Sequence, residues 1–349
     1  MKKIENWWQS IDRLNFIFIL SLGLTGIVLS FSVSEKFYLI NRHSIFFIVG
    51  IVLLIYLSQL DDKNIRRISL LGFILSIFFI FIILFMDFEV KGAKRWIRIY
   101  TFTLQPSEII KPFFIILSAW GISQSINGKK YYLSVSFILF LLLISGILLQ
   151  PDLGMTMLIS FTFFCQLFVA GLSIFLVIFG IVFLITIGLV SFFIFDHVRL
   201  RIISFLGGAD TYQIDLSIKA FKSGGIFGKG PGQGDLKEKI PDANTDFIFA
   251  VAGEELGLIF CLVILIIILS IIIKTLINVL KTQDPYKMIA ITGLICSFGL
   301  QSLINVFSSL GIIPTKGTTL PFVSYGGSSM IAISILFGFL LSLTNKNHE

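Results

Sequence analysis

The stretch "LIFCLVILIIILSIII" at residues 258–273 follows directly on "PDANTDFIFAVAGEELG" at 241–257, which carries four carboxylates, Asp242, Asp246, Glu254 and Glu255. The first stretch approaches the roughly 20 apolar residues that a helix needs to cross a bilayer. Carboxylates beside hydrocarbon are costly and are usually retained for a function. The junction therefore predicts a membrane-spanning fold with a functional segment at the end of one span.

The whole chain has the composition of a membrane protein. Hydrophobic residues make up 56% of its 349 residues and charged residues 13%, and its mean hydropathy is +0.96. Soluble domains carry about 25% charged residues. Uniformly apolar runs predict an all-α integral membrane protein of about ten transmembrane helices, near 14–33, 44–60, 68–87, 106–122, 132–149, 153–171, 174–195, 247–273, 288–310 and 322–343. The first run is too long for a signal-peptide core, so we expect it to be retained as a span.

The positions of Lys and Arg predict the orientation in the membrane. With both termini in the cytoplasm, the inner connections are richer in these residues than the short outer connections. The basic outer loop "VKGAKRWIRIYTF" at 90–102 is the main exception, so either the orientation is inverted or this loop is basic for a functional reason. The longest connection, about 196–245, falls on the same outer face between the seventh and eighth spans. We treat residues 1–349 as a single polytopic membrane domain.

The long outer connection contains "GGIFGKGPGQG" at 224–234. Its spacing does not match a P-loop, and no Ser or Thr follows Lys229, so nucleotide binding is not predicted. A backbone that bends closely around a ligand and a merely flexible loop are equally compatible with this composition. The three cysteines and three histidines have neither CxxC nor HExxH spacing, which argues against a disulfide framework or a zinc site.

Further polar residues are expected at the outer ends of spans. In "LQPSEIIKPF" at 104–113, Glu108 and Lys111 are one helical turn apart and should face each other. A water-accessible groove and a structural ion pair explain them equally well. Asp152 in the tight link between the fifth and sixth spans is expected to cap a helix. Small residues in "PTKGTTLPFVSYGGSS" at 314–329 favour close helix packing over a ligand site.

Six segments occur in an order typical of one known family: "KGAKRWI", "QPSEIIK", "QPDLG", "YQIDLSIKAFKSGGIFGKGPGQG", "PDANTDFIFAVAGEELG" and "PTKGTTLPFVSYGGSS". With them the chain resembles the SEDS proteins (shape, elongation, division and sporulation) from about residue 10 to 343. "GKGPGQG" and "PTKG" look more like the division branch of the family than the elongation branch. Asn244 stands where many relatives have His, and 206–211 looks shorter than the family's usual connection.

The resemblance implies a ten-helix inner-membrane glycosyltransferase that polymerises lipid II on the outer face. A class B penicillin-binding protein would act with it as transpeptidase, alongside other membrane proteins of the divisome at the septum. Carried over residue by residue, the catalytic aspartate falls on Asp246 and the loop tryptophan on Trp96. The family's Glu/Lys pair falls on Glu108 and Lys111.

The implied reaction needs a base near the attacking 4-hydroxyl and positive charge near the pyrophosphate that leaves. Asp246 would be the base, although on its own it would be read as a helix N-cap. The candidate substrate-binding residues are Lys91, Lys94, Arg95, Trp96, Arg199, Arg201, Lys316 and Ser324. A divalent cation, Mg²⁺ or Mn²⁺, is expected to assist, with ligands that the sequence does not identify.

Two other functions fit a polytopic bundle with charged residues at its outer end: a lipid II flippase and a non-enzymatic scaffold for division proteins. The chain shows no convincing internal repeat of the kind found in transporters. Glu254 and Glu255 follow Asp246 by eight and nine residues, about 12–13 Å along a helix. We therefore expect them to anchor structure or the long loop and not to share the catalytic centre.

Overall fold

The computed structural model describes residues 7–33, 37–86, 94–99, 102–171, 174–194, 199–200, 203, 207, 211–315 and 317–345. These residues are mainly helical. The helices are α2 (Arg13–Val33), α3 (Phe37–Leu57), α4 (Asp62–Ile83), α5 (Pro106–Ile126), α6 (Tyr131–Leu149), α7 (Leu153–Val169), α8 (Ile174–Ile194), α10 (Thr211–Gly224), α11 (Ile248–Val279), α12 (Pro285–Ser309) and α13 (Gly327–Leu343). A two-stranded antiparallel sheet of β1 (Ile97–Ile99) and β2 (Phe102–Leu104) lies between α4 and α5.

Among the described residues, seven helices are long and apolar enough to cross a membrane: α2, α3, α4, α5, α6, α11 and α12. The remaining three expected spans correspond to shorter apolar helical segments, Leu153–Val169, Ile178–Ile194 and Gly327–Leu343. The multi-pass helical fold is therefore confirmed, and the count of ten crossings remains a prediction. Each expected apolar run lies on a helix, because uniformly apolar sequence in lipid must satisfy its backbone within the segment.

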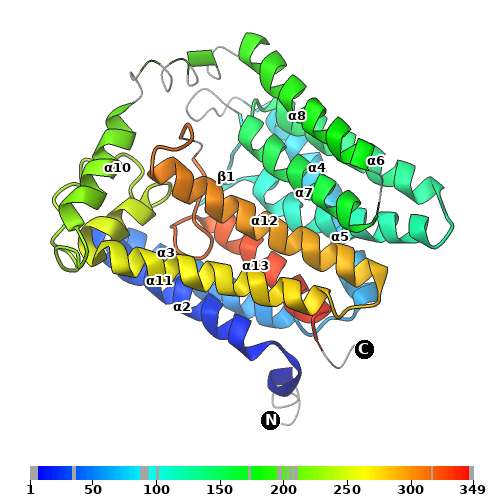
Figure 1. Cartoon of the computed structure of the whole chain (residues 1–349), viewed down its shortest axis with the longest axis horizontal. Coiled ribbons are helices and arrows are strands. Elements are labelled where there is room, and N and C mark those ends of the chain that lie inside the picture. Colours follow the sequence, from blue (N-terminus) through cyan, green and yellow to red (C-terminus); the bar gives the residue numbers. More distant parts are fainter. Residues whose placement is uncertain are drawn as a thin grey trace.

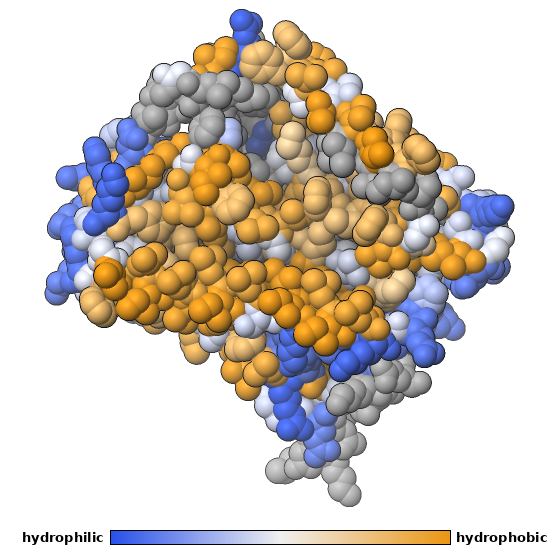
Figure 2. All heavy atoms as spheres, in the orientation of Figure 1, coloured by the Kyte–Doolittle hydropathy of each residue, from blue (hydrophilic) through white to orange (hydrophobic). Residues whose placement is uncertain are grey.

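Helices α5 and α12 form the centre of the bundle. Their apolar windows are 72% and 78% buried, whereas no other candidate span exceeds 39%. Helix α5 packs against α4, α6, α12 and α13, and α13 packs most extensively against α3. The helices at the periphery of the bundle instead expose apolar side chains. Figure 2 shows hydrophobic residues spread over the visible flank, with hydrophilic residues gathered toward the ends. This distribution is that of a bundle surrounded by lipid.

The two ends of the bundle are built differently. At the end that holds the start of α2, Lys274 pairs with Asp12, and the Ser342 hydroxyl donates to the Leu60 carbonyl. The opposite end carries α10 and the loop that leads into α11 (Figure 1). The long connection therefore contains a helix, α10, that was not predicted from the sequence.

Helix α11 is interrupted near the end of the bundle that carries α10, which we call the outer end after its predicted orientation. Gly257 has φ +80° and ψ 178°, a conformation outside the helical region. A Cβ at this position would lie 2.4 Å from the Gly228 backbone nitrogen, so no other residue fits without displacement of the loop. A short first segment, 248–256, is therefore separated from the long apolar segment that follows.

Candidate active site

Asp246 lies in the turn that precedes α11. The backbone N–H groups of Thr245 and Asp246 both donate to the Asp242 carbonyl at 3.0 Å, and Asp242 itself is left-handed with φ +57°. The N-cap of α11 is Phe247, which makes no side-chain capping bond. The structure therefore does not support the interpretation of Asp246 as the N-cap, and the side chain of Asp246 is half-buried.

Three successive carbonyls of this turn accept hydrogen bonds that hold it in place. The Asn244 carbonyl accepts from the backbone N–H of Tyr325 at 2.9 Å. The Thr245 carbonyl accepts from the Ser324 hydroxyl at 2.5 Å, and the Asp246 carbonyl accepts from Asn305 Nδ2 at 2.9 Å. The donors come from α12 and from the loop before α13, so distant parts of the chain fix the backbone at Asp246.

The loop before α13 also approaches the carboxylate itself. A Cβ at Gly317 would lie 3.1 Å from Asp246 Oδ2, which places this backbone in contact range of the acid. Ser324, expected to contact substrate, is buried, and its hydroxyl also accepts from the Leu320 N–H at 2.7 Å. In this structure Ser324 therefore joins the two loops.

The expected pair of Glu108 and Lys111 forms in the interior. Lys111 Nζ lies 2.6 Å from Glu108 Oε2, and the residues are only 4% and 7% exposed, respectively. Lys111 Nζ also donates to Gln301 Oε1 at 2.7 Å. Gln301 Nε2 in turn donates to the Thr319 carbonyl at 3.2 Å. The ion pair is thus buried and connected through α12 to the loop that contacts Asp246.

The basic outer loop is attached to the link between α6 and α7. Arg95 Nε donates to the Gln150 carbonyl at 3.0 Å, and Arg95 Nη1 lies 3.7 Å from Asp152 Oδ2. Asp152 caps α7 as expected, since Oδ1 accepts from the Met155 N–H at 3.1 Å. Arg95 thereby holds the segment that leads into the β1–β2 hairpin, a hairpin that the sequence did not predict.

The other candidate binding residues are placed as follows. Lys94 and Trp96 are half-buried beside Arg95, and Arg199 is exposed. Lys91, Arg201 and Lys316 lie outside the residues that the structure describes. Their expected contacts with substrate remain predictions.

Glu254 holds the Gly-rich loop, by which we mean residues 225–247 between α10 and α11. Its carboxylate accepts from the backbone N–H groups of Asp235 and Leu236 at 3.0 and 3.2 Å, and Lys229 Nζ lies 3.2 Å away. The side chain is fully buried. Glu254 therefore fixes the second half of the loop to the first segment of α11.

Glu255 holds the same loop from the other side. It pairs with Lys237 Nζ at 2.9 Å and accepts from the Gly232 N–H at 3.1 Å. A Cβ at Gly228 would lie 2.2 Å from the Glu255 carbonyl oxygen, which explains glycine at this contact. The geometry thus agrees with the expected loop-anchoring role of both acids and with a loop that is packed against α11.

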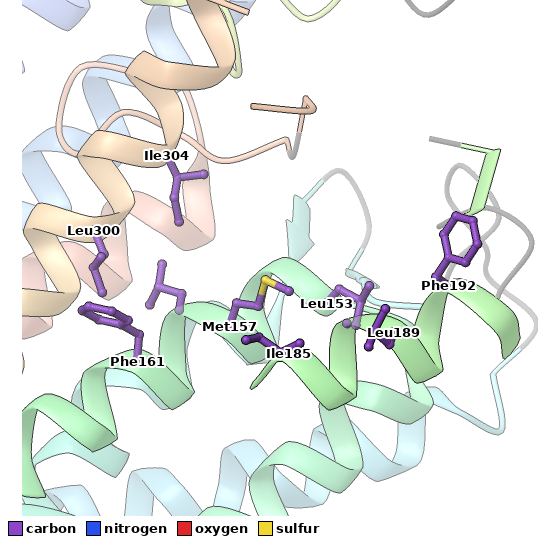
Figure 3. Close-up of a pocket in the computed structure, with 10 residues that line it drawn as sticks. Leu153, Met157, Phe161, Ile185, Leu189, Phe192, Leu300 and Ile304 are labelled. Atoms are coloured by element: carbon purple, nitrogen blue, oxygen red, sulfur yellow. The ribbon is translucent and has the colours of Figure 1, made fainter. Parts of the chain in front are cut away.

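An apolar groove of about 700 Å³ opens between α7, α8 and α12. Figure 3 shows side chains from the three helices along it, and its lining residues are Leu153, Met157, Leu158, Phe161, Ile185, Gly188, Leu189, Phe192, Leu300 and Ile304. Leu153 follows the α7 cap Asp152 directly, and Ile304 precedes Asn305. One end of the groove therefore lies beside the two polar clusters described above, the one at Asp152 and the one at Asn305.

Within the described part of the chain, no group of three or more His, Cys, Asp or Glu side chains is arranged to hold a metal ion. Hydrated Mg²⁺ usually needs only one or two protein carboxylates when substrate phosphates supply the other ligands. The half-buried Asp246 carboxylate is of the right chemistry for such a role.

Comparison with known proteins adds the family. The family described as "Cell cycle protein", which takes its label from FtsW, RodA and SpoVE, matches residues 6–349. The chain belongs to the SEDS family. It is 36% identical to a probable peptidoglycan glycosyltransferase FtsW of Caulobacter vibrioides, over 97% of this chain and 90% of that protein. It is 32% identical to the FtsW of Geobacter metallireducens, over 99% and 96%.

Solved structures of SEDS proteins share this fold. A chain from "Structural coordination of polymerization and crosslinking by a peptidoglycan synthase complex" superposes with a TM-score of 0.82 at 23% identity, covering 97% of this chain and 98% of that chain. The rod shape determining protein RodA of Thermus thermophilus gives a TM-score of 0.72 at 23% identity, covering 97% of each chain. The two sequence relatives above carry the name FtsW, which agrees with the division branch expected from the motifs.

Proposed function

We infer that the chain is a peptidoglycan glycosyltransferase of the FtsW type that polymerises lipid II at the outer face of the inner membrane. Its full-length similarity to FtsW proteins supports the activity. The observation that carries the assignment of the site is the fixed turn at Asp246, whose three carbonyls are held by α12 and by the loop before α13. A fixed backbone is what a catalytic base requires, since reacting groups must be held in place before reaction.

In the proposed reaction, Asp246 accepts the proton of the acceptor sugar's 4-hydroxyl as that oxygen attacks the anomeric carbon of the donor. The bond from the anomeric carbon to the pyrophosphate oxygen breaks, and its electron pair leaves with undecaprenyl pyrophosphate. Attack from the opposite face converts the α linkage into a β-1,4 bond. One carboxylate suffices, unlike the paired acids of glycoside hydrolysis.

Positive charge near the leaving group would stabilise the transition state. Lys94 and Arg199, with Lys91, Arg201 and Lys316, are the proposed contacts of the pyrophosphate. Arg95, from its place beside Asp152, would add positive electrostatic potential at the leaving group. A divalent cation, Mg²⁺ or Mn²⁺, would neutralise the pyrophosphate charge, with the phosphates as its principal ligands.

The apolar groove between α7, α8 and α12 fits the lipid part of such a substrate. It is lined by side chains that suit a polyprenyl chain, and it starts next to Asp152 and Asn305. A tail in this groove would bring its pyrophosphate to the outer polar end of the bundle. A class B penicillin-binding protein is the proposed partner, in septal synthesis together with other divisome proteins.

The replacement Asp246→Asn tests the assignment. It preserves size but removes basicity, so polymerisation should slow by about 10²–10⁴-fold while the fold persists. Purified protein with its transpeptidase partner, lipid II and Mn²⁺ would be assayed for glycan strands, with lipid II binding measured in parallel. Asp242→Asn is the matched control, because its side chain is exposed in the same turn and Asn tolerates the left-handed backbone.

The same assay separates the alternative functions. A flippase or a scaffold predicts no polymer from the unmodified protein. Polymerisation by Asp246→Asn at the unmodified rate would show that Asp246 is not the base. Asp152 would then be the next outer carboxylate to test, although its capping bond favours a structural role.

A further inference from the structure

Helix α12 presents two buried amides toward the outer end, one turn apart. Gln301 and Asn305 are 2% and 1% exposed, and their spacing of four places them on the same helical face. Polar amides inside a transmembrane helix are costly unless they are hydrogen-bonded, and they commonly join helices and loops. Gln301 reaches the Glu108–Lys111 pair, and Asn305 reaches the turn at Asp246.

Asn305 bridges the two loops that surround the catalytic carboxylate. Its Nδ2 donates to the Asp246 carbonyl at 2.9 Å and to the Thr318 carbonyl at 2.6 Å. The donor assignment is fixed, because both partners are carbonyl oxygens and only the NH₂ side of the amide can donate. Both N–H groups of this one side chain are therefore engaged by loops that are far apart in the sequence.

Neither loop is held at this point by regular secondary structure. The N–H of Ala250, the residue four positions after Asp246, bonds to the Phe247 carbonyl at 3.0 Å, so the first turn of α11 does not engage the Asp246 carbonyl in the usual α-helical pattern. On the other side, Gly317 approaches Asp246 Oδ2, and Thr318 follows it directly. One amide thus fixes both the backbone of the acid and the segment that contacts its carboxylate.

We propose that Asn305 is a positioning residue for glycosyl transfer, which acts through Asp246 without contact with the substrate. This inference rests on the proposed role of Asp246 as the base. A displacement of a reacting group by about 1 Å can cost about 10²-fold in rate. Loss of the Asn305 bridge should therefore lower kcat by about 10–100-fold and leave KM for lipid II within about twofold.

The chain supplies a matched control for this replacement. Asn15 on α2 is also 1% exposed and donates through Nδ2 to Thr275 Oγ1 at 3.2 Å, near the opposite end of the bundle. Among the residues that the structure describes, neither buried Oδ1 has a hydrogen-bond partner. Asn15→Ala therefore removes the same atoms from an equally buried site and breaks a side-chain hydrogen bond, away from Asp246.

The experiment compares Asn305→Ala, Asn305→Leu and Asn15→Ala in the assay of purified protein with its partner, lipid II and Mn²⁺. The Leu variant keeps the number and branching of the side-chain heavy atoms and leaves no cavity, so it remains informative where Ala impairs folding. We expect the fall in kcat only for the Asn305 variants, and we expect hydrogen exchange to increase at 241–247 and 317–325 in them alone. Asn15→Ala should lower the melting temperature with kcat retained.

The outcomes distinguish failure of the positioning role of Asn305 from failure of the proposed catalytic role of Asp246. If Asp246→Asn is inactive while Asn305→Leu keeps the unmodified kcat, the positioning role is overturned and the proposed function stays intact. Equal losses of kcat in the Asn305 and Asn15 variants would also overturn it, because the effect would then be general destabilisation. Activity of Asp246→Asn would instead refute the catalytic assignment itself.

Discussion

Replacing Glu108 by Gln should destabilise the protein strongly, because it leaves the ammonium of Lys111 buried without its counter-charge. The structure places these groups 2.6 Å apart with side chains that are 9% and 4% exposed. After the replacement, Lys111 retains its hydrogen bond to Gln301 but faces the apolar side chains of Phe114 and Ile115. Removing one partner of a buried pair costs about 3–5 kcal/mol.

The double replacement Glu108→Gln with Lys111→Met should recover most of this loss. It removes both charges, so no uncompensated charge is left in the interior. Asp235→Asn is the control, since the Asp235–Lys229 pair has a similar separation of 2.8 Å but its carboxylate is 79% exposed. Exposed pairs contribute little, so we expect almost no change there.

Thermal unfolding in detergent would be followed with a thiol-reactive fluorophore in a background that keeps the buried Cys261 and lacks the half-buried Cys165 and Cys296. Glu108→Gln should melt several degrees below the unmodified protein, and the double variant should melt close to it. A Glu108→Gln protein with unchanged melting temperature would refute the argument from charge burial. A double variant that is stable but inactive would show that one of the two groups contacts substrate.

Two further predictions concern the membrane and the groove. In a variant without native cysteines, a membrane-impermeant thiol reagent added outside sealed cells should label a cysteine at position 223 and not one at 281; labelling at 281 would reverse the orientation. Gly188→Leu should fill the groove beside Met157, where a Cβ already approaches Cε at 3.5 Å, and should weaken photocrosslinking to a polyprenyl phosphate by about tenfold, roughly 1.4 kcal/mol. Val182→Leu on the exposed face of the same helix should leave crosslinking unchanged, and equal effects of both would exclude the groove as the lipid site.

Local features of the fold were predictable because their causes are local. Long apolar runs place the spans, since backbone groups in lipid must be satisfied within a helix. The Glu108–Lys111 pair follows from a spacing of three residues, and the Asp152 cap from its position before α7. The β1–β2 hairpin and α10 were missed, because both are short or polar elements within connections that apolar periodicity does not describe.

The connections around Asp246 were not predictable from the sequence, because they join residues that are far apart along it. The bonds from Asn305 to Asp246 and from Ser324 to Thr245 span 59 and 79 residues. One signal was available: Gln301 and Asn305 are amides within the expected span 288–310, where such polar side chains are usually retained for a reason. That signal identifies the residues but not their partners, which only the packing of α5, α12 and the outer loops determines.

The acids before the apolar run at 258–273 divide into two kinds of role. Glu254 and Glu255 are buried, and each accepts hydrogen bonds from the Gly-rich loop and pairs with a lysine of that loop, so their burial is compensated within the protein. Because Gly257 interrupts the helix directly after them, their carboxylates belong to the outer segment 248–256 and not to the span. Asp246 differs in being half-buried, with its backbone fixed by α12 while its carboxylate stands at the outer end. The same stretch therefore combines two acids that hold the loop with the acid that we propose as the catalytic base.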